Sequence, residues 1–332
     1  MTVKVTVIGV GAMGRNHARV YAELPGVELT AVSDNNLDLA NELADKYGVS
    51  AYQNYAEMLK KEKPQAVSIA VPTAMHEEVA SAAMQAGAHV LIEKPIASKI
   101  EEGQRLIKLA DSLGRKLMVG HIVRFNPAIK TLREKLQKNE LGRIFQIVCR
   151  RVGPFPARIR DVGVVIDLAP HDIDIMRYLT GMNPERIYAE IERRVHTDFE
   201  DLVFSLLHFP NNVTGAIEIN WLTPTKVREI IVLGERGMFQ VNDLTQDLFF
   251  FENAEMNGEL WPVLGNITGV SEGRMVRYSL ERYEPLRAEL EAFIEAVTED
   301  KPVPITGEDG LEALRLALAM IESGRTHQAI KV

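Results

Sequence analysis

A stretch near the start of the chain, residues 4–18, limits the possible folds more than any other part of the sequence. A β-branched apolar run typical of a buried parallel strand ends at Gly9, and a helical apolar pattern begins at Ala12. The glycines between and after them have the spacing G-x-G-x-x-G, which suits a tight turn pressed against a pyrophosphate at a helix N-terminus. The residues expected to bind a dinucleotide here are Gly9, Gly11, Ala12, Met13 and Gly14.

A carboxylate follows the second predicted strand, residues 28–33, at the position that discriminates between dinucleotides. Asp34 comes twenty residues after Gly14, where a carboxylate accepts a hydrogen bond from the adenosine ribose 2′-hydroxyl. A carboxylate also repels a 2′-phosphate, and Asn35 and Asn36 bring no cation to hold one. We therefore expect NAD as the cofactor in preference to NADP. The alternative is an ordinary strand-helix-strand unit in which Asp34 only caps a helix.

The composition excludes several classes of protein. The chain has 332 residues, 46% of them hydrophobic and 25% charged, which fits a globular protein of two domains. A net charge of −8 argues against nonspecific binding to nucleic acid or anionic membranes, and no apolar run is long enough to span a bilayer. The first strand begins almost at Met1, leaving no room for a signal peptide, and Cys149 is the single cysteine. We expect a cytoplasmic protein with no nucleic-acid or membrane partner.

Strands and helices alternate over the first part of the chain, and strands dominate afterwards. The alternation predicts a doubly wound parallel sheet of the α/β Rossmann type over residues 1–122. Residues 123–332 are predicted to form an α+β C-terminal domain with a large, mostly antiparallel sheet. Residues 252–273 are predicted as a long loop or lid, and two closing helices are able to pack back on the first domain. An exposed face of the second sheet would suit a homodimer or homotetramer.

Ligands of doubly wound sheets bind beyond the carboxyl ends of the strands, so the residues that follow each strand are the candidates for function. Those after the strands at 66–71, 89–92 and 116–119 are Pro72, His76, Glu93, Lys94, Arg124 and Asn126. The pair Glu93-Lys94, fixed by the following proline, would project an ammonium group toward the nicotinamide. The alternative is a surface ion pair at a turn. We expect the first five to contact the cofactor, and Lys94 and Asn126 to contact the substrate.

A second polar group occurs at residues 164–179. Pro170 is tolerated in the first turn of a helix, so a helix is predicted to begin near residue 167 or 168, with Asp167 and His171 on one face. An aspartate that orients a histidine suits proton transfer from an alcohol. In the alternative interpretation, Asp167 caps the helix and His171 is simply buried. A metal site with Asp174 lacks further ligands at the usual spacing, so no metal is expected.

Four arginines occur between residues 150 and 160, on a proline-containing segment that leads to His171. Guanidinium groups bind the oxygens of phosphates and carboxylates bidentately. Arg158 and Arg160 are therefore predicted to bind an anionic part of a substrate, such as a nucleotide diphosphate or a uronate. Salt bridges within an oligomer would explain the arginines equally well.

Together these motifs resemble the glucose-fructose oxidoreductase, inositol dehydrogenase and MocA (Gfo/Idh/MocA) family over essentially the whole chain. The glycine motif, the triplet Glu93-Lys94-Pro95 and the spacing from Asp167 to His171 occur in the family's order. The resemblance implies that Lys94 and His171 lie beside the nicotinamide and the substrate hydroxyl, and that Asp167 supports them. Within the family, residues 151–174 look most like UDP-N-acetylglucosamine 3-dehydrogenases.

The expected function is NAD-dependent oxidation of a ring hydroxyl of a sugar or nucleotide sugar to a ketone, at C3 of UDP-N-acetylglucosamine. The expected catalytic residues are Lys94, Asp167 and His171, and these three with Asn126, Arg158 and Arg160 are the expected substrate contacts. One alternative is a family dehydrogenase of inositol, a free sugar or a UDP-uronate. Another is a non-catalytic dinucleotide-binding sensor, which the presence of the three catalytic residues disfavours.

Overall fold

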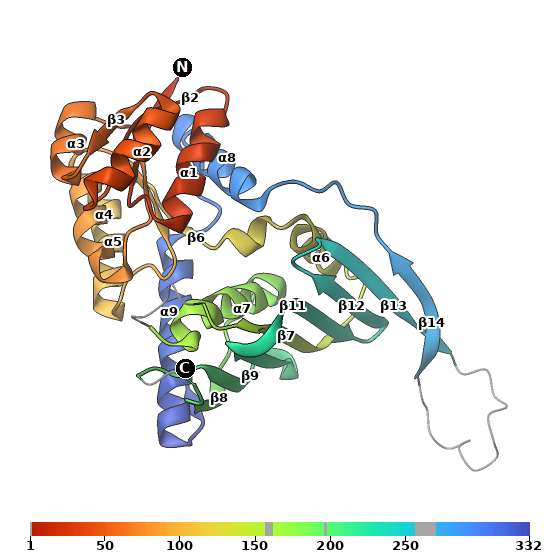
Figure 1. Cartoon of the computed structure of the whole chain (residues 1–332). Helices are drawn as coiled ribbons and strands as arrows, with labels where there is room; N and C mark the ends of the chain where they lie inside the picture. The colour runs from red at the N-terminus through yellow and green to blue at the C-terminus, as the bar shows by residue number, and fades with distance from the viewer. Residues whose placement is uncertain (1, 157–161, 196–197, 256–269) are drawn as a thin grey trace, which may run out of the picture. The chain divides into compact units, whose positions relative to one another are not determined.

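The structure, a computed structural model, describes residues 2–156, 162–195, 198–255 and 270–332. The chain divides into two compact units (Figure 1). The first comprises Met1–Phe125 and Glu284–Arg315, and the second comprises Asn126–Tyr283 and Leu316–Val332. The first unit extends beyond residue 122 because the short helix η2 (Ile122–Phe125) packs against α8 (Pro285–Thr298), which belongs to the same unit.

The first unit contains a six-stranded parallel sheet with the order β3-β2-β1-β4-β5-β6. Its strands are β1 (Val3–Ile8), β2 (Val27–Ser33), β3 (Ser50–Tyr52), β4 (Ala66–Ile69), β5 (His89–Glu93) and β6 (Leu117–Gly120). The connections run outward in opposite directions from β1 and β4, which confirms the predicted doubly wound Rossmann sheet. β3 was not predicted because three residues are too few to show an alternating pattern.

Helices flank this sheet on both faces, as the connectivity requires. They are α1 (Ala12–Glu23), α2 (Leu37–Tyr47), α3 (Tyr55–Glu62), α4 (His76–Gln85) and α5 (Ile100–Leu113), with the turn η1 (Thr73–Met75). Ion pairs connect some of these helices to their neighbours. Arg19 on α1 pairs with Glu284, which directly precedes α8, and Arg105 on α5 pairs with Glu77 on α4. The helix α9 (Gly307–Thr326) begins in the first unit and ends in the second.

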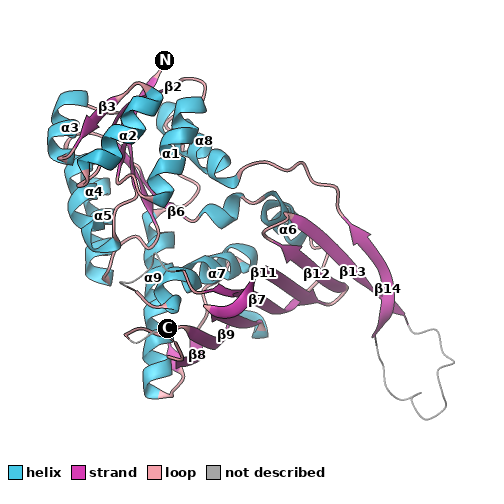
Figure 2. Cartoon of the chain, viewed as in Figure 1, coloured by secondary structure: helices cyan, strands magenta, loops and turns pink. Residues whose placement is uncertain are grey.

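The second unit contains a nine-stranded sheet with the order β14-β13-β12-β11-β7-β10-β9-β8-β15 (Figure 2). Its strands are β7 (Ile144–Pro154), β8 (Arg186–Glu192), β9 (Leu202–His208), β10 (Thr214–Asn220), β11 (Leu222–Gly234), β12 (Gly237–Asn242), β13 (Asp247–Glu255), β14 (Val270–Arg277) and β15 (Ile330–Lys331). Only β7 and β10 pair in parallel, so the predicted large and mostly antiparallel sheet is confirmed for the described residues.

One face of this sheet is covered by helices of the same unit. These are α6 (Pro127–Gln137), α7 (Val164–Thr180) and the end of α9, with the turn η3 (Pro210–Asn212) joining β9 to β10. A Cβ atom at Gly215 would lie 2.9 Å from the sulfur of Met176, and Ser323 on α9 accepts a hydrogen bond from the Ala189 backbone. The opposite face leaves large apolar side chains exposed, among them Phe204, Leu206 and Met275.

The start of α7 corrects the sequence prediction. The helix begins at Val164, and Pro170 lies inside it, where it removes one backbone hydrogen bond. The earlier start is possible because Glu200 caps the helix. Its carbonyl accepts from Val164 N at 2.9 Å, and its carboxylate accepts from Val165 N at 3.2 Å. Since Glu200 is 35 residues further along the chain than Val165, no local pattern indicated this cap.

The prediction of a loop over residues 252–273 is also wrong at both ends, where the structure has strands. β13 continues to Glu255, and β14 begins at Val270 and pairs with β13 in antiparallel orientation. The remaining residues of that prediction, 256–269, lie outside the described residues. β14 was missed because its sequence, VSEGRMVR, mixes charged residues and glycine with few apolar ones, and the strand depends on pairing with its neighbour.

Candidate active site

The glycine-rich turn between β1 and α1 has the geometry of a dinucleotide cradle. Gly9 has φ = +85°, and a Cβ atom there would lie 2.6 Å from the Ala70 carbonyl oxygen. A Cβ at Gly14 would lie 1.7 Å from the Gly9 carbonyl oxygen, so both positions exclude side chains. A Cβ at Gly11 would meet nothing within 4 Å, which leaves space for a pyrophosphate to approach. Ala12 and Met13 open α1, and its first turn carries no acidic residue that would oppose an anion.

Asp34 lies at the end of β2, and its carboxylate is fixed beside this turn. One oxygen accepts a hydrogen bond from Val10 N at 2.8 Å, and the other accepts from Asn36 N at 2.9 Å. The structure adds a cation that the sequence analysis missed: Arg15 on α1 forms two hydrogen bonds of 2.8 Å with Glu42 on α2. Since Glu42 neutralises this guanidinium, it is less suited to hold a 2′-phosphate.

The carboxyl ends of β4 and β5 are held together by a buried histidine. His76, which is 1% exposed, places its two ring nitrogens 2.8 Å from the Pro95 carbonyl oxygen and 3.1 Å from that of Val71. Burial lowers the pKa of His76, although both carbonyl groups oppose the shift. The ring nitrogens therefore hold the two loops, where the sequence predicted a cofactor contact. Pro72 lies directly after Val71, in extended backbone before η1.

Glu93 is the last residue of β5 and Lys94 follows it, and both side chains are partly buried. Nε2 of His17 on α1 lies 3.0 Å from a Glu93 carboxylate oxygen. Burial alone would raise the pKa of Glu93, but the hydrogen bond and electrostatic attraction from His17, followed by the positive charge of Lys94, outweigh it, so the pKa is lowered. Glu93 thus stays ionised at the edge of the sheet where a nicotinamide is expected.

Arg124 and Asn126, both predicted as ligand contacts, have structural uses in their own units. Arg124 is 9% exposed and pairs with Asp309 at 3.1 Å. Asn126 is 1% exposed, accepts a hydrogen bond from Ala128 N as the cap of α6, and donates to the side chain of Asp243 at 2.7 Å. The sequence pattern gave no sign of the two carboxylate partners, because Asp309 and Asp243 are both distant in the chain.

In the second unit, Asp167 and His171 lie one turn apart on α7, and each side chain is partly buried. Asp167 is a helical residue rather than the cap, so the capping interpretation is wrong. A carboxylate and an imidazole at this spacing share one helix face, which suits a proton-transfer pair in which the carboxylate orients the ring. Asp174, by contrast, is 1% exposed.

The four arginines have different environments. Arg150 pairs with Glu218 at 2.9 Å on the sheet, and Arg151 is buried against Asp172 of α7 with hydrogen bonds of 2.9 and 3.0 Å. These two are occupied by structural ion pairs. Arg158 and Arg160, the predicted anion contacts, lie outside the described residues.

Arg228 on β11 is a further cation that the sequence analysis missed. It lies beside Arg151 in register, and one of its nitrogens donates to the carbonyl oxygens of Val152 and Val227, each at 2.7 Å. Burial, together with the nearby positive charge of Arg151, lowers the pKa of Arg228 to about 10. Asp167 is among the carboxylates that favour its charged form, so Arg228 belongs to the same polar region as the proposed proton-transfer pair.

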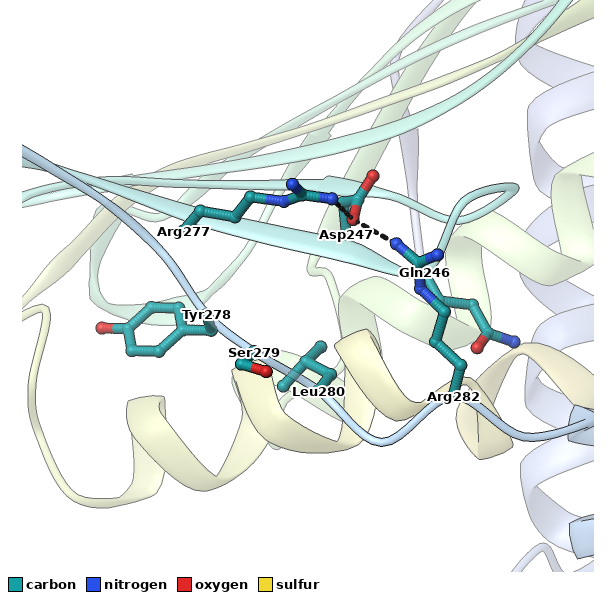
Figure 3. A pocket seen from close by; sticks show the side chains of 7 residues that line it. All are labelled: Gln246, Asp247, Arg277, Tyr278, Ser279, Leu280 and Arg282. Carbon is teal, nitrogen blue, oxygen red and sulfur yellow. Dashed lines mark hydrogen bonds and ion pairs between the residues drawn. The ribbon is translucent and has the colours of Figure 1, made fainter.

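A cavity of about 500 Å³ opens elsewhere in the second unit (Figure 3). Its lining residues are Gln246, Asp247, Arg277, Tyr278, Ser279, Leu280 and Arg282. Arg277 and Arg282 each donate to one oxygen of Asp247 at 2.8 Å, as the dashed lines show. The hydrogen bond from Arg277, followed by those from Thr245 and Arg282, lowers the pKa of Asp247 to about 2. No residue predicted from the sequence as part of the active site lines this cavity.

Within the described ranges, no helix is both long and apolar enough to cross a membrane. The same residues include no group of three or more His, Cys, Asp or Glu side chains placed to hold a metal ion. Cys149 is buried, and burial raises the pKa of its thiol well above the usual value, as expected of a packed side chain.

Comparison with known proteins agrees with this geometry. Residues 3–121 match the model of the oxidoreductase family with an NAD-binding Rossmann fold, and residues 129–240 match the Gfo/Idh/MocA C-terminal domain. The chain is 31% identical to a UDP-N-acetylglucosamine 3-dehydrogenase of Acidithiobacillus ferrooxidans over 94% of each chain, and 27% identical to a myo-inositol 2-dehydrogenase of Thermotoga maritima over 99% and 98%. A solved structure of the former superposes with a TM-score of 0.86 and covers 98% of each chain. The chain therefore belongs to the Gfo/Idh/MocA family and is an NAD(P)-dependent oxidoreductase that acts on CH–OH donors.

Proposed function

We propose that the chain is an NAD-dependent dehydrogenase that oxidises the C3 hydroxyl of UDP-N-acetylglucosamine to a ketone. The observation that supports this choice of substrate is the 31% identity to a UDP-N-acetylglucosamine 3-dehydrogenase over 94% of both chains. Lys94, Asp167 and His171 are present as that chemistry requires. A second candidate, inositol oxidation, is favoured by the 27% identity to a myo-inositol 2-dehydrogenase.

NAD, when bound, accepts a hydride from the carbinol carbon of the substrate. Lys94 polarises the hydroxyl oxygen and makes it easier to ionise. His171 takes the hydroxyl proton, and Asp167 orients the imidazole and stabilises its charged form. A non-catalytic sensor would need only the glycines and Asp34, so these three side chains favour an enzyme.

The preference for NAD over NADP is supported by charges around the ribose position. Asp34 is fixed there by two backbone N–H groups, and its negative charge repels a 2′-phosphate. Arg15 is the nearby cation, but its guanidinium is already paired with Glu42.

The substrate proposal is tested by following NADH absorbance with the purified protein and NAD. The substrates to compare are UDP-N-acetylglucosamine, its uronate, UDP-glucose, inositol and free glucose, with NADP replacing NAD in a parallel series. Because ketone formation is often unfavourable, an amine donor with its aminotransferase traps the product. Turnover with UDP-N-acetylglucosamine alone supports the proposal, and turnover only with inositol replaces it with the second candidate.

Arg158→Ala and Arg160→Ala are each expected to raise KM for UDP-N-acetylglucosamine by about tenfold or more, because a charge-assisted hydrogen bond to the diphosphate is lost. KM for a neutral sugar should barely change. Steady-state kinetics with both substrates check this result. Arg150→Ala is the matched control, since Arg150 already pairs with Glu218 and should leave both KM values unchanged. Equal effects on charged and neutral substrates would rule out the diphosphate role.

We also propose that the protein forms a homodimer or homotetramer through the open face of the second sheet. Leu206, Ala216, Val148 and Ile231 lie side by side in register across four strands. Leu206 is 55% exposed and Phe204 is 51% exposed, which is unusual for large apolar residues on a sheet.

Leu206→Lys is accordingly expected to shift the mass measured by light scattering from that of an oligomer to that of a monomer, because a charge on this face would be buried on association. Leu244→Lys is the control, since Leu244 is 47% exposed but lies in the turn between β12 and β13. A wild-type protein that is already monomeric would contradict the proposal.

A further inference from the structure

The helix α8 carries a carboxyl group with no obvious use in the proposed mechanism. Glu289 is 0% exposed, and neither of its side-chain oxygens has a hydrogen-bond partner. An ionised carboxylate is costly to bury without partners, so such a group holds a proton instead. Burial, and then the negative charge of Glu93, raises the pKa of Glu289 well above its usual value.

Glu93 is the ionised member of this carboxyl pair. It accepts a hydrogen bond from His17, whose ring is 0% exposed and whose Nδ1 atom has no partner. The Glu93 carboxylate also packs at the end of β6, where a Cβ atom at Gly120 would lie 3.3 Å from it. Two neighbouring carboxyl groups thus hold opposite protonation states.

The titratable groups around the pair come from several elements. Glu93 is faced by His17 from α1, His76 from α4, Glu289 from α8 and its neighbour Lys94. Glu289 is also faced by Tyr21 from α1, whose hydroxyl lies 2.8 Å from that of Ser68. The other charged groups on α1 and η2 are already in ion pairs. Arg15 pairs with Glu42, and Arg19 pairs with Glu23 and Glu284. Arg124 pairs with Asp309. The proton on Glu289 therefore responds chiefly to charge at the end of β5.

We propose that Glu93 and Glu289 carry one negative charge between them, with the proton on Glu289, and that Glu289 releases this proton to solvent when a cationic nicotinamide ring is bound at the end of β5. The inference rests on the proposed function, which puts the cofactor at that edge of the sheet. The O–H bond of Glu289 breaks, and no electrons are transferred in this step. Glu289 takes a proton back when the bound ring is the neutral reduced form.

The expected size of the change in the pKa of Glu289 follows from electrostatics. In general, two unit charges roughly 10 Å apart at an effective dielectric constant of about 20 shift each other's pKa by about one unit, and a shift of this order is expected for Glu289. By linkage, the affinity for NAD should rise about tenfold as the pH is raised through the titration of Glu289. The affinity for NADH, whose ring is neutral, should not follow this trend.

Calorimetry tests the inference with the whole protein and NAD alone. Binding is measured in two buffers of different ionisation enthalpy at a series of pH values from neutral upward, because the pKa of Glu289 is raised. The wild type should release protons on binding NAD but not on binding NADH. Glu289→Gln keeps the shape and cannot ionise, so its release should vanish and its affinity should not rise with pH. Glu291→Gln on the same helix is the control, because Glu291 is 51% exposed, and it should behave as the wild type.

Equal proton release by the wild type and Glu289→Gln would overturn the inference and leave the proposed function standing. Failure of the wild type to bind NAD would instead overturn the cofactor assignment and the inference together. If Glu289→Gln does not fold, the wild-type affinities decide, since a parallel pH dependence for NAD and NADH would contradict a role for the ring charge.

Discussion

Replacing Lys94 with methionine, or His171 with alanine, is expected to lower kcat by about 10²-fold or more while NAD still binds. Methionine is unbranched and nearly as long as lysine, but it has no charge to polarise the substrate hydroxyl. Alanine at position 171 removes the group that takes the hydroxyl proton. Steady-state NADH formation at saturating substrate measures the loss, and NAD titration by calorimetry shows that the cofactor site is intact.

Lys99→Met is the control for Lys94→Met, because Lys99 lies on the same loop of the first unit with an exposed side chain. It should turn over as the wild type. Near-normal turnover of both the Lys94 and the His171 variants would refute the assigned roles. A lower affinity for NAD without a change in kcat would move Lys94 from the chemical step to cofactor binding.

Gly14→Ala should destabilise the first unit by about 3 kcal/mol and abolish NAD binding, because the added methyl group would lie 1.7 Å from the Gly9 carbonyl oxygen and force the backbone apart. Gly11→Ala should leave the free energy of unfolding unchanged, since its methyl group meets nothing within 4 Å and the backbone φ of −65° suits alanine. Its affinity for NAD should nevertheless fall by about tenfold or more, because the methyl fills the space that a pyrophosphate needs.

The two alanine variants therefore separate folding from binding at one turn. Denaturant unfolding followed by circular dichroism gives the stability of each variant, and calorimetry gives its affinity for NAD. Unchanged NAD affinity in Gly11→Ala would mean that the pyrophosphate does not lie against this turn. A fully stable Gly14→Ala would mean that the helix and the strand are further apart than the structure shows.

Local patterns predicted much of the first unit. The glycine spacing, the carboxylate at Asp34 and the alternation of strands and helices are features of neighbouring residues, and each predicts a backbone geometry directly. The start of α7 was misjudged because Glu200, which caps it, belongs to a distant segment. Arg151 was grouped with three other arginines, although its buried partner Asp172 decides its role. Ion pairs between distant segments leave no local signature.

Two residues could have been found with closer attention to helix faces. Glu289 follows Leu286 and precedes Leu290 and Phe293 on the apolar stripe of α8, where a carboxyl group is out of place. His17 occupies a similar position on α1. The sequence alone shows a polar residue on the buried face of an amphipathic helix. It does not show that Glu93 on β5 is the hydrogen-bond partner of His17, which depends on the fold.

The late return of the chain to the first unit has a consequence for how the protein is made. Residues 284–315 complete that unit, and Leu286, Leu290 and Phe293 of α8 are almost entirely buried in it. A ribosome that has finished the glycine-rich turn and all six parallel strands must still synthesise eight of the nine strands of the second sheet before α8 emerges. The nucleotide-binding half, although it comes first in the sequence, therefore cannot close its core until residues 284–315 have been synthesised. Folding from the N-terminus onward, the usual order during synthesis, is not available to it.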